Sequence, residues 1–187
     1  RPLALTGFGG PIRLGRRGER SLLAQTAFLH GNDGQPVLMF AVDVIGFDAA
    51  WTERVRAKVN ERTGIPPKNI ILNASHTHCA PQTQRLFTYE GSGALDETFI
   101  GSLENTLVEI GCEAFTNSGD ATLRVCLGTN THVTHRRRWD GSKWINAPNF
   151  ADEPIRDLPI LDCQREDGAR VLIAIVSGHP TTWAETI

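Results

Sequence analysis

The chain has 187 residues, of which 40% are hydrophobic and 21% are charged, and its formal net charge is -2. This length suffices for one domain with a buried core, since a chain of about 150 residues already buries roughly two thirds of its unfolded surface. The charge balance gives no reason to expect nucleic acid or an anionic membrane as a partner, and no apolar run approaches the roughly 18 residues of a transmembrane segment.

A β-hairpin is predicted near the amino terminus. Its two strands span 21–30 and 36–43, and both are rich in apolar residues. The loop between them, Gly31-Asn32-Asp33-Gly34, consists of turn formers, which favours a tight connection.

A helix is predicted next, from Asp48 as its capping residue to about Thr63. Three apolar residues recur every four positions, the spacing of one helix face: Trp51, Val55 and Val59. Gly64 and the prolines that follow end the helix. The next strand should then run parallel to the strand before the helix, through a right-handed crossover.

The following apolar run, which starts at Asn69, ends in two histidines one residue apart. Successive side chains of a strand point to opposite faces, so His76 and His78 are predicted to share a face, with Thr77 on the other. Two neutral imidazoles on a stiff strand can ligate one zinc ion or a similar metal. The alternative is a pair of hydrogen-bonded polar residues at a strand end, and the short motif alone does not decide between them.

The second half of the chain continues the α/β pattern. Asp96 opens a helix with an apolar stripe formed by Phe99, Ile100, Leu103, Leu107 and Ile110. A strand is predicted over 122–134 and a buried strand over 170–176, directly before His179. Ligand sites in open α/β sheets gather at the carboxyl ends of strands, so the three histidines are expected to meet in one site. Considered alone, His179 would be interpreted as a residue that caps a turn before Pro180.

Two segments resemble known motifs. The run Asn73-Ala74-Ser75-His76-Thr77-His78-Cys79-Ala80-Pro81 resembles the S-x-T-H-T-H-S-G-P signature of the neutral/alkaline, non-lysosomal ceramidase family. Gly178-His179-Pro180-Thr181-Thr182 is similar to that family's downstream H-P-T segment. Less specific matches to the family follow the same order along the chain: a glycine-rich opening at 5–10, and the segments 42–46, 136–137, 140–141 and 146–149. The chain departs from the signature where Cys79-Ala80 replaces Ser-Gly, and where His135 stands in the N-R element.

Members of that family are zinc-dependent hydrolases of a lipid amide bond. The resemblance therefore implies zinc as the cofactor, with His76, His78 and His179 as its ligands. It also implies Arg136 as a catalytic residue of the substrate pocket, which binds a developing oxyanion or a substrate hydroxyl. Zinc lowers the pKa of bound water to about 7 and polarises a carbonyl oxygen, and both effects suit amide hydrolysis. The alternative for Arg136 is a place in a solvated basic run.

The sequence leaves the roles of two residues near the histidines undecided. Asp43, at a strand end, reads equally as a turn residue or as a carboxylate that orients a ligand imidazole. Cys79 could ligate a metal as a thiolate, but strand alternation puts it on the face of Thr77. The four cysteines lack the paired spacing of zinc or redox motifs and are predicted to be buried thiols.

The resemblance implies an α/β fold, a layered mixed β-sheet flanked by helices, in an incomplete ceramidase-type catalytic domain. Residues 1–187 are then its amino-terminal portion, because the family's remaining zinc ligands and a catalytic serine lie beyond its third histidine. We expect the chain alone to be inactive, and to associate with itself or with a second polypeptide that completes the domain. The expected substrate is a small-molecule lipid amide, and the resemblance favours a secreted or periplasmic location.

Two other functions remain open. One is a truncated, non-catalytic binding or structural module of the same fold, and the other is a zinc amidohydrolase that acts on a different amide or ester. A metallo-β-lactamase site would need H-x-H-x-D-H, whereas Cys79-Ala80-Pro81 follows the second histidine here. A cupin would need a glutamate a few residues on, and the next glutamate is Glu90.

Overall fold

The computed structural model describes residues 2–8, 12–15, 21–32, 34–84 and 94–180. Their contacts divide the chain into two compact units, one of Arg1–Ser118 with His179–Ile187 and the other of Gly119–Gly178. That residues 1–187 are one portion of a larger domain stays a prediction. No helix among the described residues is both long and apolar enough to cross a membrane.

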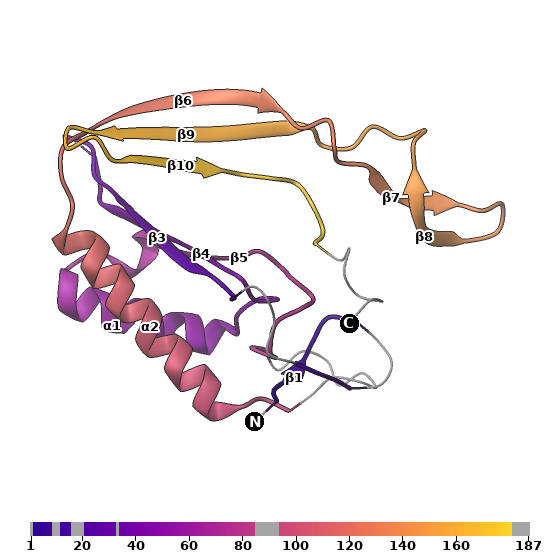
Figure 1. The fold of residues 1–187 in the computed structure, drawn as a ribbon, viewed down its shortest axis with the longest axis horizontal. Helices are drawn as coiled ribbons and strands as arrows, with labels where there is room; N and C mark the ends of the chain where they lie inside the picture. The colour runs from indigo at the N-terminus through magenta and orange to yellow at the C-terminus, as the bar shows by residue number, and fades with distance from the viewer. Residues whose placement is uncertain (1, 9–11, 16–20, 33, 85–93, 181–187) are drawn as a thin grey trace. The chain divides into compact units, whose positions relative to one another are not determined.

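A three-stranded mixed sheet forms the centre of the first unit, in the order β3 (Ala24–Leu29), β4 (Val37–Val42) and β5 (Ile70–Ala74) (Figure 1). β3 and β4 are antiparallel, as the predicted hairpin requires. β4 and β5 are parallel, with Val42 opposite Ala74, which confirms the predicted crossover. The two parallel strands therefore end at the same edge of the sheet.

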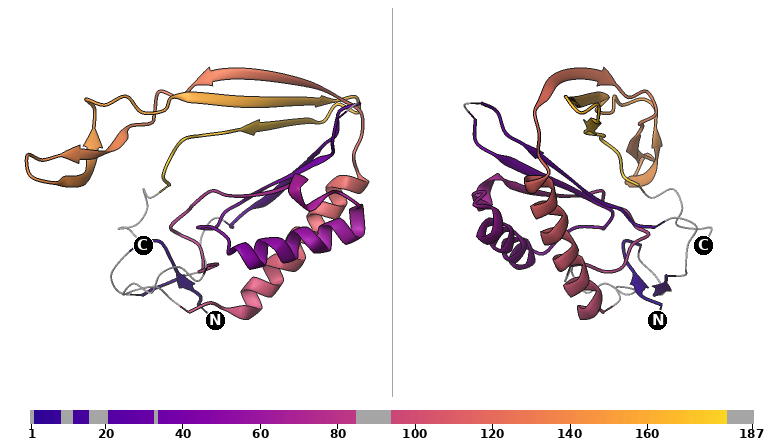
Figure 2. Two further views of the ribbon diagram at one scale, coloured as in Figure 1. Left: turned by 180° about the vertical axis from the view of Figure 1, so that it is seen from behind. Right: turned by 60° about the vertical axis from the view of Figure 1, so that its left-hand side comes forward.

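Two helices cover one face of this sheet, as the views in Figure 2 show. They are α1 (Ala49–Thr63) and α2 (Glu97–Thr116). The carboxylate of Asp96 caps α2 by accepting a hydrogen bond from the Phe99 amide at 2.9 Å, as predicted. Asp48 occupies the N-cap position of α1, but its side chain makes no capping hydrogen bond, contrary to the prediction.

The core of the first unit lies between the sheet and the helices. Alternate residues of β4 point into it, and both Leu38 and Phe40 are almost completely buried. From α1, Val55 and Val59 meet them, which confirms the predicted helix face. Gly111 of α2 lets the helix approach the sheet closely, because a Cβ there would lie only 2.7 Å from Cζ of Phe40.

A short amino-terminal hairpin packs beside the loop that follows β5. It consists of β1 (Ala4–Leu5) and β2 (Arg13–Leu14), and Leu5 also forms a β-bridge with Pro81. A single 3-10 turn, η1 (Pro67–Asn69), leads into β5. The hairpin thus brings residues 5–8 of the glycine-rich opening next to the two histidines after β5, while residues 9–10 of the opening lie outside the described residues.

The second unit consists of two antiparallel sheets. Its larger sheet has the strand order β10 (Arg170–Ala174), β9 (Asp157–Arg165) and β6 (Ala121–Thr129). The smaller one is a hairpin of β7 (His135–Trp139) and β8 (Trp144–Asn149). In the larger sheet β9 pairs with β10, the next strand in sequence, and also with β6, which lies much earlier in the chain.

Several predictions for the second unit need correction. The strand predicted over 122–134 ends at Thr129, and the basic run begins the separate strand β7. β10 lies where a buried strand was predicted, but its Leu172 is 56% exposed, because it is an edge strand of a three-stranded sheet. The described cysteines are all free, yet Cys126 is exposed rather than buried.

Candidate metal centre

Three histidines from distant parts of the chain meet in the first unit. Ligand nitrogens of His76, His78 and His179 all lie within 4.8 Å of one another. The Nε2 atoms of His78 and His179 are 2.9 Å apart, although 101 positions separate the two residues. The ring centroid of His76 lies 5.1 Å from each of the other two. The structure thus brings them together as the sequence predicts, whereas their role as metal ligands stays a prediction.

The first two histidines lie in a loop, which corrects the predicted strand geometry. β5 ends at Ala74, and His76 has a positive φ of 60°, in the left-handed region. Such a conformation is uncommon for a residue other than glycine and tends to occur at functional sites. A turn therefore brings His76 and His78 together, so strand alternation decides neither their direction nor that of Cys79.

A backbone carbonyl orients the His76 ring. Nδ1 of His76 lies 2.7 Å from the carbonyl oxygen of Ile45, in the loop that follows β4. Because a carbonyl oxygen only accepts, Nδ1 carries the hydrogen and the lone pair of the neutral ring is on Nε2. The two loops are held side by side, since the Ser75 amide donates to the Val42 carbonyl at 2.9 Å. Metal-binding histidines commonly use this arrangement, in which the second ring nitrogen donates to a carbonyl.

Arg13 and Phe8 support the second histidine. One guanidinium nitrogen of Arg13 donates to the carbonyl oxygens of His78 at 2.7 Å and of Thr6 at 2.8 Å. The same guanidinium lies 4.6 Å from the centre of the Phe8 ring. Phe8 in turn meets the His78 ring in a T-shaped contact with centroids 4.6 Å apart. Backbone and ring of His78 are thus both held from the amino-terminal hairpin.

Gly7 makes this close approach possible. Its φ is 107°, and a Cβ at this position would lie 2.7 Å from both Cβ and Nδ1 of His78. Any larger residue would therefore collide with the imidazole and also adopt a strained backbone. The neighbouring amide of Thr6 donates to the Ala80 carbonyl at 3.2 Å, which anchors the segment to the loop after β5.

The structure shows what Asp43 and Cys79, whose roles the sequence left undecided, contact. The Asp43 carboxylate accepts a hydrogen bond from the Leu23 amide at 3.0 Å, and the Asp43 amide donates to the Leu23 carbonyl at 2.9 Å. Asp43 therefore joins the ends of neighbouring strands, while the Ile45 carbonyl orients the His76 ring. Cys79 is not part of the histidine group, and its amide donates to the Thr77 hydroxyl at 3.2 Å.

The donor set suits a borderline metal. Within the described part of the chain, the group contains imidazoles alone, with His78 buried, His179 half-buried and His76 exposed. Imidazole nitrogen is a usual ligand of zinc and of several other transition metals, whereas calcium and magnesium prefer oxygen. Three converging imidazoles therefore fit the predicted zinc and would equally fit related divalent metals.

The predicted catalytic arginine lies elsewhere in the chain. Arg136 is on β7, in the second unit, and its side chain is exposed. Its catalytic role stays a prediction. Thr181 and Thr182 of the second motif lie outside the described residues.

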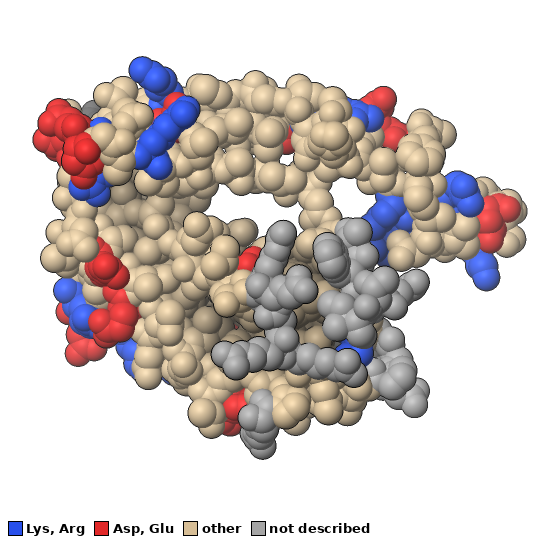
Figure 3. Space-filling view, in the orientation of Figure 1, with Lys and Arg blue, Asp and Glu red and all other residues tan. Residues whose placement is uncertain are grey.

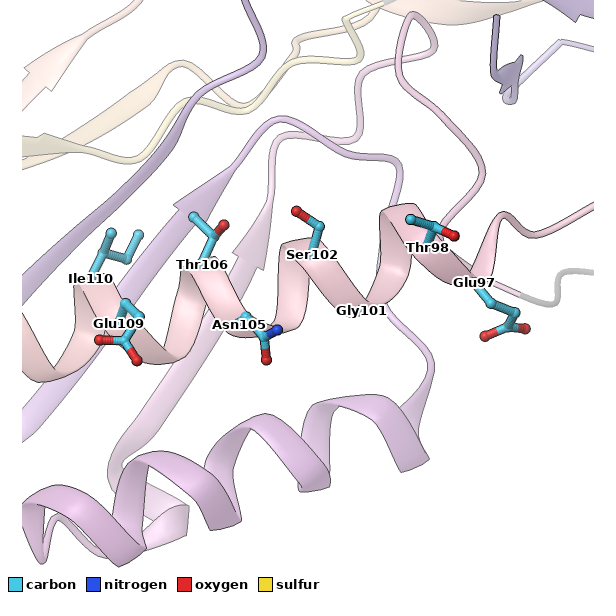
Figure 4. Close-up of a pocket in the computed structure, with 8 residues that line it drawn as sticks. All are labelled: Glu97, Thr98, Gly101, Ser102, Asn105, Thr106, Glu109 and Ile110. Carbon is cyan, nitrogen blue, oxygen red and sulfur yellow. The ribbon is translucent and has the colours of Figure 1, made fainter. Parts of the chain in front are cut away.

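A surface groove runs along α2, apart from the histidines. It is lined by Glu97, Thr98, Gly101, Ser102, Asn105, Thr106, Glu109 and Ile110. Figure 4 shows Thr98, Ser102 and Thr106 pointing to one side of the helix, with Asn105 and Glu109 on the other. All the lining residues come from one helix and none is a histidine or cysteine, so the groove is separate from the metal centre.

Sequence reasoning missed the supporting residues of this centre. Ile45 acts through its backbone carbonyl, for which an apolar side chain gives no signal. Arg13 follows the glycine-rich opening, but nothing in the sequence indicates that it reaches the His78 carbonyl, 65 positions away. The close contact of Gly7 could have been suspected from the glycine-rich segment itself.

Comparisons with known proteins support the fold. No family model matches the chain, and no curated protein matches it. A solved structure described as ceramidase complexed with C2 matches with a TM-score of 0.65 and 15% identity, over 83% of this chain and 25% of that one. Neutral ceramidase from Pseudomonas aeruginosa matches with a TM-score of 0.69 and 14% identity, over 95% of this chain and 29% of that one.

The chain therefore spans between 25% and 29% of the length of these ceramidases. At this level of identity the likeness shows the fold. The predicted resemblance to the ceramidases is confirmed in that respect, as is the α/β fold of a ceramidase-type domain.

Proposed function

We propose that this chain forms part of a zinc-dependent hydrolase that cleaves the amide bond of a lipid-like substrate, as a ceramidase does. The observation that carries the proposal is the convergence of His76, His78 and His179. The ceramidase-type fold supports it, because the two motifs that resemble the family's zinc-binding segments supply these same histidines.

The chemistry follows from the donor set. A zinc ion held by these imidazoles would polarise a carbonyl oxygen and acidify a water molecule at an open position. The chain's own contribution is to orient the ligands. The Ile45 carbonyl keeps the His76 hydrogen on Nδ1, so that Nε2 is the nitrogen left to bind. The Arg13 guanidinium holds the backbone of His78 in place.

We assign Arg136 to the substrate rather than to the metal. A guanidinium carries a positive charge, and its planar donors suit an oxygen that becomes negative during the reaction. The small-molecule lipid amide is part of the same proposal. Association with a second copy, or with a polypeptide that completes the domain, also remains a prediction, which light scattering can test.

Because the chain alone is expected to be inactive, the proposal is tested on the complete domain that we propose. Elemental analysis of the purified protein is followed by hydrolysis assays with a fluorescent ceramide, a short-chain amide and a short-chain ester. Zinc together with ceramide cleavage supports it, provided that the double variant His76→Ala/His78→Ala loses both. Zinc with cleavage of only the short substrates would indicate a different amide or ester. Zinc with no turnover would indicate a non-catalytic module, and a protein that binds no metal would overturn the proposal.

A further inference from the structure

The tip of the β7–β8 hairpin carries a pair of exposed tryptophans. Trp139 and Trp144 are directly opposite each other across the hairpin, with ring centroids 5.7 Å apart. Their exposed fractions are 51% and 63%. Large apolar side chains gathered on a surface usually mark an interaction site. The tip is therefore a candidate for contact with a partner.

The hairpin that carries this pair is rich in basic residues. The hairpin carries four of them, against one acidic side chain: Arg136, Arg137, Arg138 and Lys143, with Asp140. Figure 3 shows blue side chains recurring along the hairpin. The hairpin thus has a net charge of +3, whereas the whole chain has -2. The hairpin is therefore positively charged although the chain as a whole is slightly negative.

The Asp140 carboxylate makes its hydrogen bonds within the turn of the hairpin. The Asp140 carboxylate accepts hydrogen bonds from the Lys143 and Ser142 amides and from the Ser142 hydroxyl, each at 2.9 Å. These bonds, first those from the backbone amides of Lys143 and Ser142, hold the pKa of Asp140 below its ordinary value. Its charge therefore stabilises the turn and only partly offsets the surrounding cations.

The base of the hairpin is held rigidly. Asn149 is only 7% exposed, and its side-chain amide donates to the Arg137 carbonyl at 2.8 Å and to the Asp152 carboxylate at 2.7 Å. Its own oxygen accepts a hydrogen bond from the Ala151 amide at 3.1 Å. A surface that is already ordered loses little conformational freedom when it binds.

We propose that the β7–β8 hairpin docks onto a membrane surface that contains anionic lipids. Tryptophan favours the interface between lipid and water, because its ring is apolar and its N–H is polar. Lysine and arginine beside it are attracted by the negative headgroups. Neither the tryptophan pair nor the cations require the three histidines, so this inference is independent of the proposed metal centre.

The geometry favours a lipid surface over a nucleic acid, although cations and aromatic rings occur in both kinds of site. Proteins that bind single strands stack successive bases on flat ring faces. Here the two rings meet at 64°, edge to face, so the edge of one ring covers part of the stacking face of the other. The two rings packed in this way form one compact apolar surface, which suits insertion among the lipid headgroups.

Sedimentation with lipid vesicles tests the inference. The wild-type chain should bind vesicles of phosphatidylcholine with phosphatidylserine about tenfold or more tightly than vesicles of phosphatidylcholine alone. The variant Trp139→Ala/Trp144→Ala should weaken binding to both kinds of vesicle by about tenfold. The variant Arg138→Gln/Lys143→Gln should lose the preference for phosphatidylserine, and added salt should have the same effect on the wild type.

Two substitutions on β6 serve as matched controls, Val125→Ala for an exposed apolar side chain and Arg124→Gln for an exposed cation. Both should bind vesicles as the wild type does. The inference is overturned if the hairpin variants bind like the controls while retaining wild-type circular dichroism, or if the wild type binds neither vesicle. Binding to single-stranded RNA in place of vesicles would also overturn it.

Discussion

The Ile45 carbonyl oxygen lies 2.7 Å from Nδ1 of His76, and this contact joins the loops that follow the two parallel strands β4 and β5. It fixes the tautomer of His76 by a backbone group, so no side-chain substitution at position 45 removes the acceptor. The orientation of this ring therefore depends on the parallel pairing of the two strands.

The first prediction concerns metal binding by the histidines. Replacing His76 or His78 with alanine should reduce bound zinc from about one equivalent to a small fraction, because two imidazoles hold a metal far more weakly than three. Elemental analysis after gel filtration measures this. His132→Ala is the matched control, since His132 is exposed and is not part of the histidine group. Full metal content in the double variant His76→Ala/His78→Ala would refute the assignment.

Gly7 allows a second prediction, with a control of the same backbone geometry. Gly7 and Gly141 have φ values of 107° and 106°, but only Gly7 lies against a side chain, that of His78. Alanine at either position should cost about 1–3 kcal/mol in backbone strain. Only Gly7→Ala should also displace the imidazole and weaken zinc affinity by about tenfold to a hundredfold. Competition with a chromogenic chelator measures both variants, and equal affinities would contradict the steric argument.

Arg13 should act as a positioning residue. Arg13→Lys keeps the charge but loses the planar group that reaches two carbonyls and covers the Phe8 ring. We expect zinc affinity to fall by about tenfold, the usual effect of losing a group that supports a ligand. The absorption bands of the cobalt-substituted protein should shift as well. Arg156→Lys, an exposed residue paired with Glu153, should leave affinity and spectrum unchanged.

Arg136 is expected to affect turnover alone. In the complete domain that we propose, Arg136→Ala should lower kcat for the lipid amide by about a hundredfold or more, the scale of losing one transition-state donor. Zinc content should stay at the wild-type value, because Arg136 is not in the histidine group. The control is Arg124→Ala on β6. If both variants keep wild-type kcat, Arg136 belongs to a solvated basic strand.

The last prediction is the pH dependence of an ion pair between the helices. The carboxylate of Glu104 on α2 lies 2.7 Å from Lys58 and 3.2 Å from Arg54, both on α1. Burial raises the pKa of Glu104, but the hydrogen bond and charge of Lys58, together with Arg54, outweigh burial and hold the pKa below its ordinary value of 4.5. The stabilisation is therefore present above pH 4.5 and is lost as the pH falls through the lowered pKa.

Accordingly, Glu104→Gln should lower the free energy of unfolding at neutral pH by about 2 kcal/mol, a typical value for hydrogen bonds to a charged group. The difference from wild type should shrink in acid, where the wild-type carboxyl is also neutral. Urea denaturation across a pH series measures it. Glu53→Gln, which removes an exposed pair with Arg56, should change stability by less than about 0.5 kcal/mol. A Glu104 effect that is constant with pH would exclude the ion pair as its cause.

The sequence predicted the elements whose signals are local. The hairpin of β3 and β4, both long helices and the capping role of Asp96 follow from alternation, from the spacing of apolar residues and from turn formers. The meeting of the histidines was also predicted, from their places just past two apolar runs. The reason given was wrong, because β5 and β10 belong to different sheets and do not share one edge.

Features that depend on contacts between distant residues could not be predicted. The left-handed conformation of His76 ends β5 early, and no residue type in that stretch requires it. The exposure of β10 reflects its place at a sheet edge, whereas its composition alone is that of a buried strand. The basic run of β7 does not look like a strand in the sequence. It becomes one by pairing with β8, which the turn at Asp140 makes possible.

The separation of His78 and His179 by 101 positions has a consequence for biosynthesis. Two of the three imidazoles leave the ribosome together, but the third follows only after the whole of Gly119–Gly178 has been made. At roughly 5–20 residues per second, this delay is about 5–20 seconds. A nascent chain with the first two histidines exposed would hold a metal weakly during that time. A metal centre built as we propose would therefore be loaded late, once His179 has joined the other two histidines.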